Sequence, residues 1–430
     1  MRSFFPPVRA IDPTTSGVCA EAIAQRWQRV GRRVRGCFAS VTLCFGVGLG
    51  LAATPAAHGP LAATFRATPE TYRILCARLA PGDTLRLAPG TYTAGLRLHG
   101  LHGRADAPIV IEGPAEGAPA VFTGDAGRNT VSIADAAYLT VRYLVLDGNG
   151  TGVDAVKAEG FPVCEYAHHI TLEGLTIVGH GRHQQQVGIS SKCPAWDWVV
   201  RDNVIVGAGT GMYFGNSDGN APFFHGLIEG NRVLDSLGYD LQVKHQLPRP
   251  ADLPGMPVAP GVTVIRGNVF RKAIDAGGET AARPNVLVGH FPQAGPGMED
   301  EYLIEDNLFD QNPREALFQG EGNVTLRGNR FLSHQTTEFP AIAIQPHNAV
   351  PRRVRIEDNV VVTPGVGISV KGASPGRPAL VRGNAVYAGM PFVGVAAAGN
   401  TTGSYTDGVG WLEKRAAESG AAGRGTPVRP

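Results

Sequence analysis

The chain has 430 residues, and its 39 Lys+Arg against 37 Asp+Glu give a formal net charge of +2. This balance excludes a nucleic-acid binder that is held mainly by bulk positive charge. Hydrophobic residues make up 43% of the chain, which excludes wholesale disorder, and its 57 Gly and 32 Pro favour tight turns and short strands over long helices.

The N-terminal region carries the pattern of a leader. Residues 37–53 are apolar and uncharged, several arginines precede them, and small residues follow at 54–57. This order is typical of a secretory signal that is cleaved near Ala56 or Ala57. The alternative is an uncleaved anchor, because the apolar run approaches the minimum length of a membrane span. We expect 1–57 to be a signal or leader region, and the mature protein to be exported, periplasmic or extracellular, without stable membrane insertion.

One short pattern recurs through the rest of the chain. It reads apolar residue, polar residue, Gly or Asp, Asn, and then alternating apolar positions, with degenerate copies around Tyr143 and Gly174. Successive Asn residues lie 22 to 39 positions apart, and a repeat of strands this short indicates a solenoid. The asparagines of the pattern are Asn203, Asn231, Asn268, Asn307, Asn329, Asn359 and Asn384.

Each copy predicts a strand, a corner at Asn and a second strand. Asn tolerates a left-handed backbone, and its amide can hydrogen-bond the Asn of the next coil, so we expect an internal Asn ladder. A further strand begins about eight residues later, as in 239–244, which gives three strands per coil. The fold class is therefore all-β, a parallel β-helix over residues 80–398. The alternative is a leucine-rich-repeat horseshoe, but its regular short Leu period is missing.

The two ends of the predicted solenoid differ in character. Residues 69–79 form an amphipathic pattern within the N-terminal segment 58–79, and we expect a helix there that caps the first coil. The C-terminal tail, 399–430, ends in Gly, Ala, Pro and Arg and is expected to be flexible.

Two cysteines provide a separate test of the coil spacing. Cys164 and Cys193 each lie ten residues before a predicted corner, at Gly174 and Asn203. Equal offsets place them in the same turn of successive coils, about 4.8 Å apart, which a disulfide can span. An exported protein permits this bond. The alternative is a pair of unpaired core thiols.

The opening of the predicted solenoid carries a family signature. Residues 81–92 read PGDTLRLAPGTY and residues 107–114 read APIVIEGP. This opening resembles the start of the chondroitinase-B/alginate-lyase group of polysaccharide lyases and, more broadly, the pectin-lyase-like superfamily of right-handed β-helices. The resemblance implies a right-handed, single-stranded parallel β-helix. It is specific for the fold rather than for an activity.

The resemblance also implies a reaction. In that lyase group a Lys abstracts the C5 proton of a uronate, an Arg on the next coil assists, and Ca²⁺ held by acidic residues and an Asn neutralises the substrate carboxylate. Lys244 matches the Lys and Asn216 parallels the metal-binding Asn, whereas the next coil, 285–290, has no Arg in the expected place. Asp240 and Glu279 are the candidate ligands for Ca²⁺.

Lysine usage singles out one predicted strand class. The chain has 33 Arg but only 6 Lys, and Lys157, Lys192, Lys244 and Lys371 all fall near the end of that strand. A partly desolvated Lys can act as a base, which Arg cannot. The alternative is that outward residues are polar on any soluble β-helix. The candidate substrate-binding residues on this face are Asn216, Gln242, Arg283, Gln319, Glu321, Gln345 and His347.

Three predicted loops flank this face. Residues 246–261 follow Lys244 and His245 directly, 276–284 precede His290, and 291–300 follow it and carry Glu299 and Asp300 as candidate cation ligands. Loops on a rigid scaffold commonly form binding walls. The alternative is tolerated surface decoration.

We therefore expect a monomeric, exported protein that acts on an acidic, uronate-containing polysaccharide by lyase-type β-elimination. Lys244 is the candidate base, and His245 or His290 supports the charge or protonates the leaving oxygen. The alternatives are a non-catalytic glycan-binding protein of the surface or envelope and a purely structural role.

Overall fold

A computed structural model describes residues 62–160, 166–250, 253–273, 282–335, 338–373, 376, 378–396 and 398–422. The predicted leader, 1–57, lies outside these residues. No helix within the described ranges combines the length and the apolar composition that crossing a bilayer requires.

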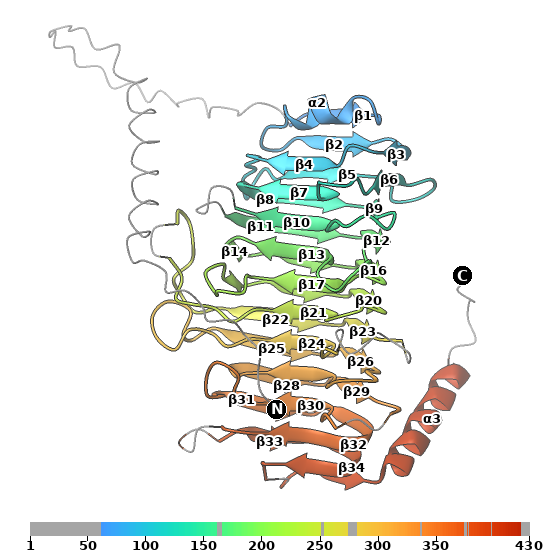
Figure 1. Cartoon of the computed structure of the whole chain (residues 1–430), viewed down its shortest axis with the longest axis vertical. Helices are drawn as coiled ribbons and strands as arrows, with labels where there is room; N and C mark the ends of the chain where they lie inside the picture. Colours follow the sequence, from blue (N-terminus) through green and yellow to red (C-terminus); the bar gives the residue numbers. More distant parts are fainter. Residues whose placement is uncertain are drawn as a thin grey trace, which may run out of the picture. The chain divides into compact units, whose positions relative to one another are not determined.

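The described residues form a parallel β-helix in which successive coils stack on one another (Figure 1). Each coil contributes strands to three faces, which we call sheets 1, 2 and 3 in the order in which the chain visits them. The strands of adjacent coils pair in parallel, as β15 does with β11 and β19. Sheets 2 and 3 join at the last coils, where β32 runs through both.

The strands of sheet 1 are β1 (Thr64–Ala67), β2 (Thr84–Leu87), β5 (Ile109–Glu112), β8 (Ala136–Arg142), β11 (Ala167–Glu173), β15 (Val199–Arg201), β19 (Leu227–Glu229), β22 (Val262–Arg266), β25 (Glu301–Glu305), β28 (Val324–Arg327), β31 (Val354–Glu357) and β33 (Leu380–Arg382), with the short β14 (Ala195–Trp196) and β18 (Phe223–Phe224) beside them. Sheet 2 contains β3 (Gly90–Tyr92), β6 (Ala120–Thr123), β9 (Leu144–Asp147), β12 (Thr176–Val178), β16 (Val204–Val206), β20 (Arg232–Leu234), β23 (Val269–Arg271), β26 (Leu308–Asp310), β29 (Arg330–Leu332), β32 (Val360–Val370), β34 (Ala385–Val393) and β35 (Thr401–Gly403). Sheet 3 contains β4 (Leu96–His99), β7 (Val131–Ala134), β10 (Val156–Glu159), β13 (Val187–Lys192), β17 (Thr210–Phe214), β21 (Leu241–Val243), β24 (Val286–Val288), β27 (Phe318–Gly320), β30 (Ile342–Ile344) and the second half of β32.

The core fills the inside of the coils. Because side chains alternate along a strand, every second residue points inward and stacks on its counterpart one coil away. The rings of Phe270, Phe309 and Phe331 form such a stack, with centroids 5.4 and 4.4 Å apart. In sheet 1 the inward column is almost wholly aliphatic and is shielded from solvent along its length; it comprises Leu85, Ile111, Val141, Leu172, Val200, Ile228, Ile265, Ile304, Leu326, Ile356 and Val381.

The predicted Asn ladder is confirmed. The side-chain amide of Asn203 donates to Oδ1 of Asn231 at 2.9 Å, and the same bond recurs from Asn231 to Asn268 at 2.9 Å. The backbone nitrogen of each Asn also donates to the Oδ1 of the next one. The ladder continues through all seven predicted positions and ends one rung later, at Asn400. These bonds satisfy polar groups that would otherwise be buried unpaired at every corner.

One detail of the predicted corner is wrong. The left-handed residue is the one before Asn, as at Asp202 (φ 55°) and Gly230 (φ 65°), and none of the ladder asparagines has a positive φ. Asn keeps an ordinary backbone because its side chain must point inward to reach the next coil. The degenerate copies follow the same geometry, since Tyr143 (φ 58°) and Gly174 (φ 59°) occupy the left-handed position.

The strands extend beyond the predicted solenoid at both ends. Strand β1 lies before residue 80, where the solenoid was predicted to begin, and it already pairs with β2. Helix α2 (Tyr72–Cys76) packs Tyr72 against the rings of Tyr92 and Phe122, as the predicted capping helix would. At the other end, β35 pairs with β34, and helix α3 (Tyr405–Ala422) follows it. The segment 399–430 thus begins with the last Asn rung and continues as helix α3, and its expected flexibility stays a prediction.

The predicted disulfide stays a prediction. Cys193 is buried, but Cys164 lies outside the described residues.

Candidate functional site

Three of the four lysines singled out in the sequence share one column of sheet 3. The register pairs Phe214 with Val243 and Val243 with Val288, so the residues that follow these strands also lie above one another. Lys157 is different, because it lies opposite Ser190, two positions before Lys192. We call the shared set the lysine column; in coil order it comprises Lys192, Gly215, Lys244, Gly289, Glu321, Gln345 and Lys371.

Glycine occupies the rung on each side of Lys244. A Cβ at Gly289 would overlap the backbone nitrogen of His245, and a Cβ at Gly215 would lie 3.1 Å from Cβ of Lys244. Gly215 also has a φ of +90°, which L side chains rarely adopt. The column therefore carries no side chain next to Lys244. At a rung spacing of about 4.8 Å, Lys192 and Glu321 lie roughly 10 Å away along the column, on opposite sides.

The ammonium group of Lys192 lies over an aromatic ring. Its Nζ is 3.2 Å from the ring centroid of Tyr213, a cation–π contact. Burial lowers the pKa of Lys192 to about 8, and the nearby Lys157 and Lys244 act in the same direction, while Asp154 opposes the shift. Lys192 is thus a cation that responds to pH near neutrality and that an approaching anion would stabilise.

Lys244 is half-buried next to a pair of stacked imidazoles. Burial lowers its pKa, and the carboxylate of Glu321 opposes the shift. On the neighbouring rungs, the rings of His245 and His290 stack with centroids 5.5 Å apart. Burial also lowers the pKa of His245, and His290 and Lys244 add to this effect. The site therefore combines an amine and an imidazole that both lose their proton more readily than in water.

The remaining predicted site residues divide into two groups. Gln242 and Gln319 lie in one column with Tyr213, beside the lysine column, although Gln242 is only 5% exposed. Gln345 belongs to the lysine column itself. Asn216 and His347 lie at the strand ends, and Oδ1 of Asn216 already accepts the backbone nitrogen of Ala221 at 3.0 Å.

Arg283 lies at the opposite end of these strands. Its guanidinium carbon is 5.9 Å from the ring centroid of Tyr239, and its backbone oxygen accepts a bond from Nζ of Lys272 at 2.7 Å. The structure therefore separates Arg283 from the Lys244 end of the face, where we expected it to bind substrate.

Asp240 does not reach the outward face. It is fully buried in the turn before β21, where Nδ2 of Asn285 donates to its Oδ2 at 2.9 Å. Burial raises the pKa of Asp240 to about 7, against the opposing charge of Lys272. Glu279, the other predicted Ca²⁺ ligand, lies outside the described residues. Within the described ranges, no three His, Cys, Asp or Glu side chains come together as a metal site.

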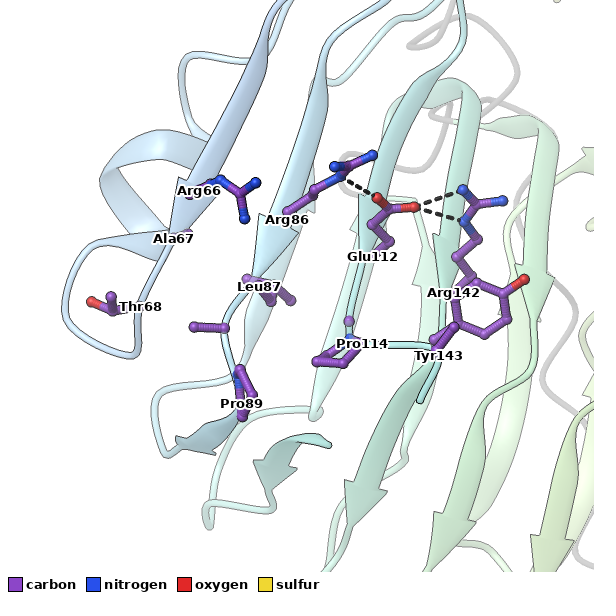
Figure 2. Close-up of a pocket in the computed structure, with 13 residues that line it drawn as sticks. Arg66, Ala67, Thr68, Arg86, Leu87, Pro89, Glu112, Pro114, Arg142 and Tyr143 are labelled. Atoms are coloured by element: carbon purple, nitrogen blue, oxygen red, sulfur yellow. Dashed lines mark hydrogen bonds and ion pairs between the residues drawn. The ribbon is translucent and has the colours of Figure 1, made fainter. Parts of the chain in front are cut away.

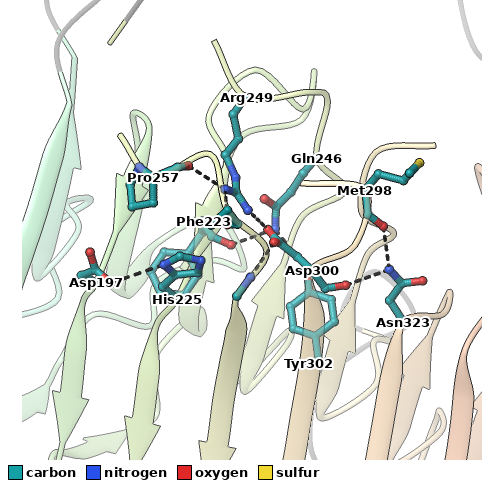
Figure 3. A network of polar contacts seen from close by, with 12 residues as sticks. Asp197, Phe223, His225, Gln246, Arg249, Pro257, Met298, Asp300, Tyr302 and Asn323 are labelled. Atoms are coloured by element: carbon teal, nitrogen blue, oxygen red, sulfur yellow. Dashed lines mark hydrogen bonds and ion pairs between the residues drawn. The ribbon is translucent and has the colours of Figure 1, made fainter. Parts of the chain in front are cut away.

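The loops beside His245 and His290 are held together by a buried ion pair (Figure 3). The guanidinium of Arg249 pairs with Asp300, and both side chains are 1% exposed. Arg249 also donates to the backbone oxygen of Pro257 at 2.7 Å, and Asp300 accepts from the nitrogen of Gly261 at 3.0 Å. These bonds join the described parts of 246–261 to 291–300 into one wall beside the two histidines.

Two ion pairs occupy the acidic residues that were candidate cation ligands in this wall. The carboxylate of Asp300 pairs with Arg249, and that of Glu299 pairs with the partly exposed Arg353. A cation at Asp300 would have to displace the buried Arg249.

Sequence reasoning singled out Lys192 with the other lysines without giving it a role, and it did not include Tyr213 at all. Tyr213 was hidden because an aromatic residue in a strand ordinarily indicates core packing. Its outward direction became visible only through the register, which places it next to Lys192 and Gln242.

No protein-family model and no curated protein sequence matches the chain. Solved structures match its fold at low identity. An alginate lyase from Paenibacillus sp. is 15% identical, with 80% of this chain and 98% of that chain covered and a TM-score of 0.40. A GH136 lacto-N-biosidase from Eubacterium ramulus is 13% identical, with 80% and 68% covered and a TM-score of 0.47. The A-module of an Azotobacter vinelandii mannuronan C-5 epimerase is 15% identical, with 75% and 88% covered and a TM-score of 0.34.

Proposed function

We propose that this protein is exported, binds an acidic, uronate-containing polysaccharide along the lysine column and cleaves it by β-elimination. The observation that supports the proposal is the setting of Lys244. It stands between two glycine rungs, beside the stacked pair His245–His290, with a cationic Lys192 two rungs away. A polymer that carries carboxylates needs such a row of cations and hydrogen-bonding groups rather than a deep pocket.

In the proposed reaction Lys244 acts as the base. Its neutral amine removes the proton at C5 of the uronate, the C5–H electrons form the C4=C5 double bond, and the glycosidic C4–O bond breaks. The lowered pKa of Lys244 raises the fraction of neutral amine at a given pH. The ring of His245 or His290 gives one proton to the leaving oxygen and takes up the proton that Lys244 removed from C5, so that the polymer ends in a hydroxyl and an unsaturated sugar and the amine is neutral again.

The substrate carboxylate must lose its charge for C5 to become acidic. The described residues do not fit the Ca²⁺ ion that the lyase resemblance implies, because Asp240 is enclosed in a turn and no acidic cluster lies on the face. We assign this role to Lys192 instead. Its ammonium group lies over the ring of Tyr213, on the same face as Lys244.

Product formation tests the proposal directly. Alginate, chondroitin and pectin are each incubated with the wild-type protein, and the ultraviolet absorbance of the unsaturated product is followed. At least one polymer should be cleaved, and Lys244→Ala should reduce the rate about a hundredfold or more. Lys414→Ala is the matched control, because Lys414 is an exposed lysine on helix α3, outside the lysine column. Equal rates for wild type and Lys244→Ala would refute the assignment of the base.

A second candidate function is glycan binding without cleavage. Glu321 favours it, because this residue is only 4% exposed and its Oε2 already accepts the backbone nitrogen of Asn348 at 3.0 Å, so the one carboxylate of the column serves the fold. Binding of an acidic oligosaccharide with no unsaturated product from any of the three polymers would select this function.

A further inference from the structure

A ladder of alternating charge runs along the outward face of sheet 1. The residue before each left-handed corner position is Arg in one coil and Glu in the next, and the register places them directly opposite one another. Arg142 binds Glu112 through Nε at 3.0 Å and Nη2 at 2.6 Å, and Arg266 binds Glu229 at 2.7 Å. In coil order the ladder reads Arg86, Glu112, Arg142, Glu173, Arg201, Glu229, Arg266, Glu305, Arg327, Glu357 and Arg382.

The alternation fails at the N-terminal end. Arg66 on β1 lies opposite Arg86 on β2, where the pattern calls for an acidic residue. Like charges that face each other on adjacent strands destabilise a sheet. Glu112 cannot compensate Arg66, because its two carboxylate oxygens already bind Arg86 at 2.7 Å and Arg142 at 2.6 Å. If Arg66 were simply a solvent-exposed charge at the end of the sheet, its exposure would be explained, but the cavity beside it would not.

A cavity of about 590 Å³ opens at this point (Figure 2). Arg66, Arg86 and Arg142 line it together with a single acidic residue, Glu112, so its charged lining has an excess of two positive charges. Its other walls are mostly apolar: Pro114 takes the corner position that Asn holds in later coils, Pro89 lies one residue beyond the same position of its own coil, and the ring of Tyr143 closes one end. The volume lies within the range of small-ligand sites.

We propose that this cavity binds the oxyanion of an acidic sugar, a carboxylate or a sulfate, between Arg66 and Arg86. A bound anion supplies the negative charge that the alternating pattern lacks at this point, and it offsets the repulsion between Arg66 and Arg86. The planar guanidinium group matches an oxyanion with two parallel hydrogen bonds, which makes Arg suited to this contact. The proline walls and the Tyr143 ring supply the flat apolar surface on which a sugar ring packs. The site lies on sheet 1, whereas the proposed reaction occupies sheet 3, so it would hold an acidic glycan without cleaving it.

Binding of glucuronate to the full chain tests the proposal by titration calorimetry, with glucose as the neutral probe and inorganic phosphate as the anion without a sugar. The wild type should bind glucuronate and not glucose. Arg66→Gln and Arg66→Glu should each weaken glucuronate binding about tenfold or more. The matched control is Arg382→Gln, at the other end of the same ladder and outside the cavity, which should bind as the wild type does.

Arg66→Glu also separates binding from folding. It completes the alternation, so its melting temperature should equal or exceed that of the wild type while binding is lost. Unchanged glucuronate binding in this variant would overturn the proposal. If phosphate binds as tightly as glucuronate, the cavity is a site for free oxyanions, and the proposal that it recognises a sugar is overturned. Because glucuronate binding at Arg66 is read without turnover, it can succeed or fail independently of cleavage by Lys244.

Discussion

The imidazole rings of His245 and His290 stack across two neighbouring coils, with centroids 5.5 Å apart and an angle of 26° between the ring planes. The two residues are 45 positions apart in the chain, and each is followed directly by one of the two loops that the Arg249–Asp300 ion pair joins. Two positive imidazoles at this separation would repel each other. After burial, the neighbouring ring is the next cause of the lowered pKa of His245.

The stack predicts a pKa change that does not depend on any activity. Burial and then His290 lower the pKa of His245, so His290→Ala should raise it towards 6.5 by removing a neighbour and admitting water. Titration of the His245 ring by NMR measures the change. His347→Ala is the control, since His347 is exposed at the end of another coil, and an equal shift in that variant would contradict the stacking effect.

Lys244→Arg separates the base from its charge. Arg keeps a cation at this position but does not lose its proton, so turnover should fall about a hundredfold or more while the affinity for an acidic oligosaccharide stays within a few-fold. In the wild type, the lowered pKa of Lys244 predicts a rate that first rises with pH, and the rate should fall again once Lys192, with a pKa of about 8 in the free protein, loses the charge that the reaction needs. Cleavage rates from pH 6 to 10 and binding at pH 7 test both statements. Substantial turnover by Lys244→Arg would mean that another group removes the proton.

Gly289→Ala should disturb the packing around Lys244 and His245, because Gly289 lies on the neighbouring rung. The added Cβ would overlap the backbone of His245, and overpacking of this kind costs about 1–3 kcal/mol. We expect a lower melting temperature together with loss of the His245–His290 ring contact. Gly410→Ala is the control, because nothing lies within 4 Å of its added Cβ on helix α3. A Gly289→Ala protein with wild-type stability would show that the rung has room for a side chain.

Asn307→Ala tests the ladder in its middle. The Asn307 amide accepts from the nitrogen and Nδ2 of Asn268 and donates to Asn329, all at 2.9 to 3.0 Å in the buried interior. Its removal leaves several buried groups unpaired and should cost about 3 kcal/mol or more of unfolding free energy. Asn400→Ala, at the partly exposed last rung, should cost less. The urea midpoints of the two variants measure these losses of stability. Equal losses for Asn307→Ala and Asn400→Ala would contradict the statement that burial makes the Asn307 bonds more important.

The effect of Lys272→Met on the free energy of unfolding should change sign between pH 5 and pH 8. Burial raises the pKa of Asp240 to about 7 and lowers that of Lys272 to about 8, so the fold favours the neutral form of each side chain. At pH 5 Asp240 is protonated, and Lys272 is a buried cation that keeps only the weaker attraction of Glu315, so the variant should be as stable as the wild type or more stable. At pH 8 Asp240 is ionised and loses its partner, so the variant should be less stable. Unfolding free energies at the two pH values measure this crossover, and a difference independent of pH would refute it.

Much of the scaffold could be predicted because its rules are local. A strand of three or four residues, a corner and an Asn every coil are visible in any stretch of the chain, and the confirmed ladder from Asn203 to Asn384 depends on nothing else. The wrong assignment of the left-handed residue was a local error of one position. It arose because the inward direction of the Asn side chain is set by the neighbouring coil.

The candidate site was harder to predict because coils differ in length. Between Lys244 and Gly289, insertions change the spacing, and only the pairing of β21 with β24 shows that the two residues are neighbours. The same register moved Lys157 out of the lysine column and brought Tyr213 to Lys192. The acidic residues show the same limit: the structure encloses Asp240 in a turn and pairs Asp300 with Arg249.

The sequence by itself determined the repeating element: short strands, their corners and the asparagines that join them, because these follow from backbone preferences and side-chain alternation within a few residues. Only the tertiary structure decided which residues of different coils become neighbours. The alternation of positive and negative charge from Arg86 to Arg382 is present in the sequence. It produces ion pairs only because the parallel pairing of the strands places each residue directly beside the next one of the series. Coulomb and hydrogen-bond energies depend on that separation in space, and loops of unequal length hide it from the order of residues in the chain.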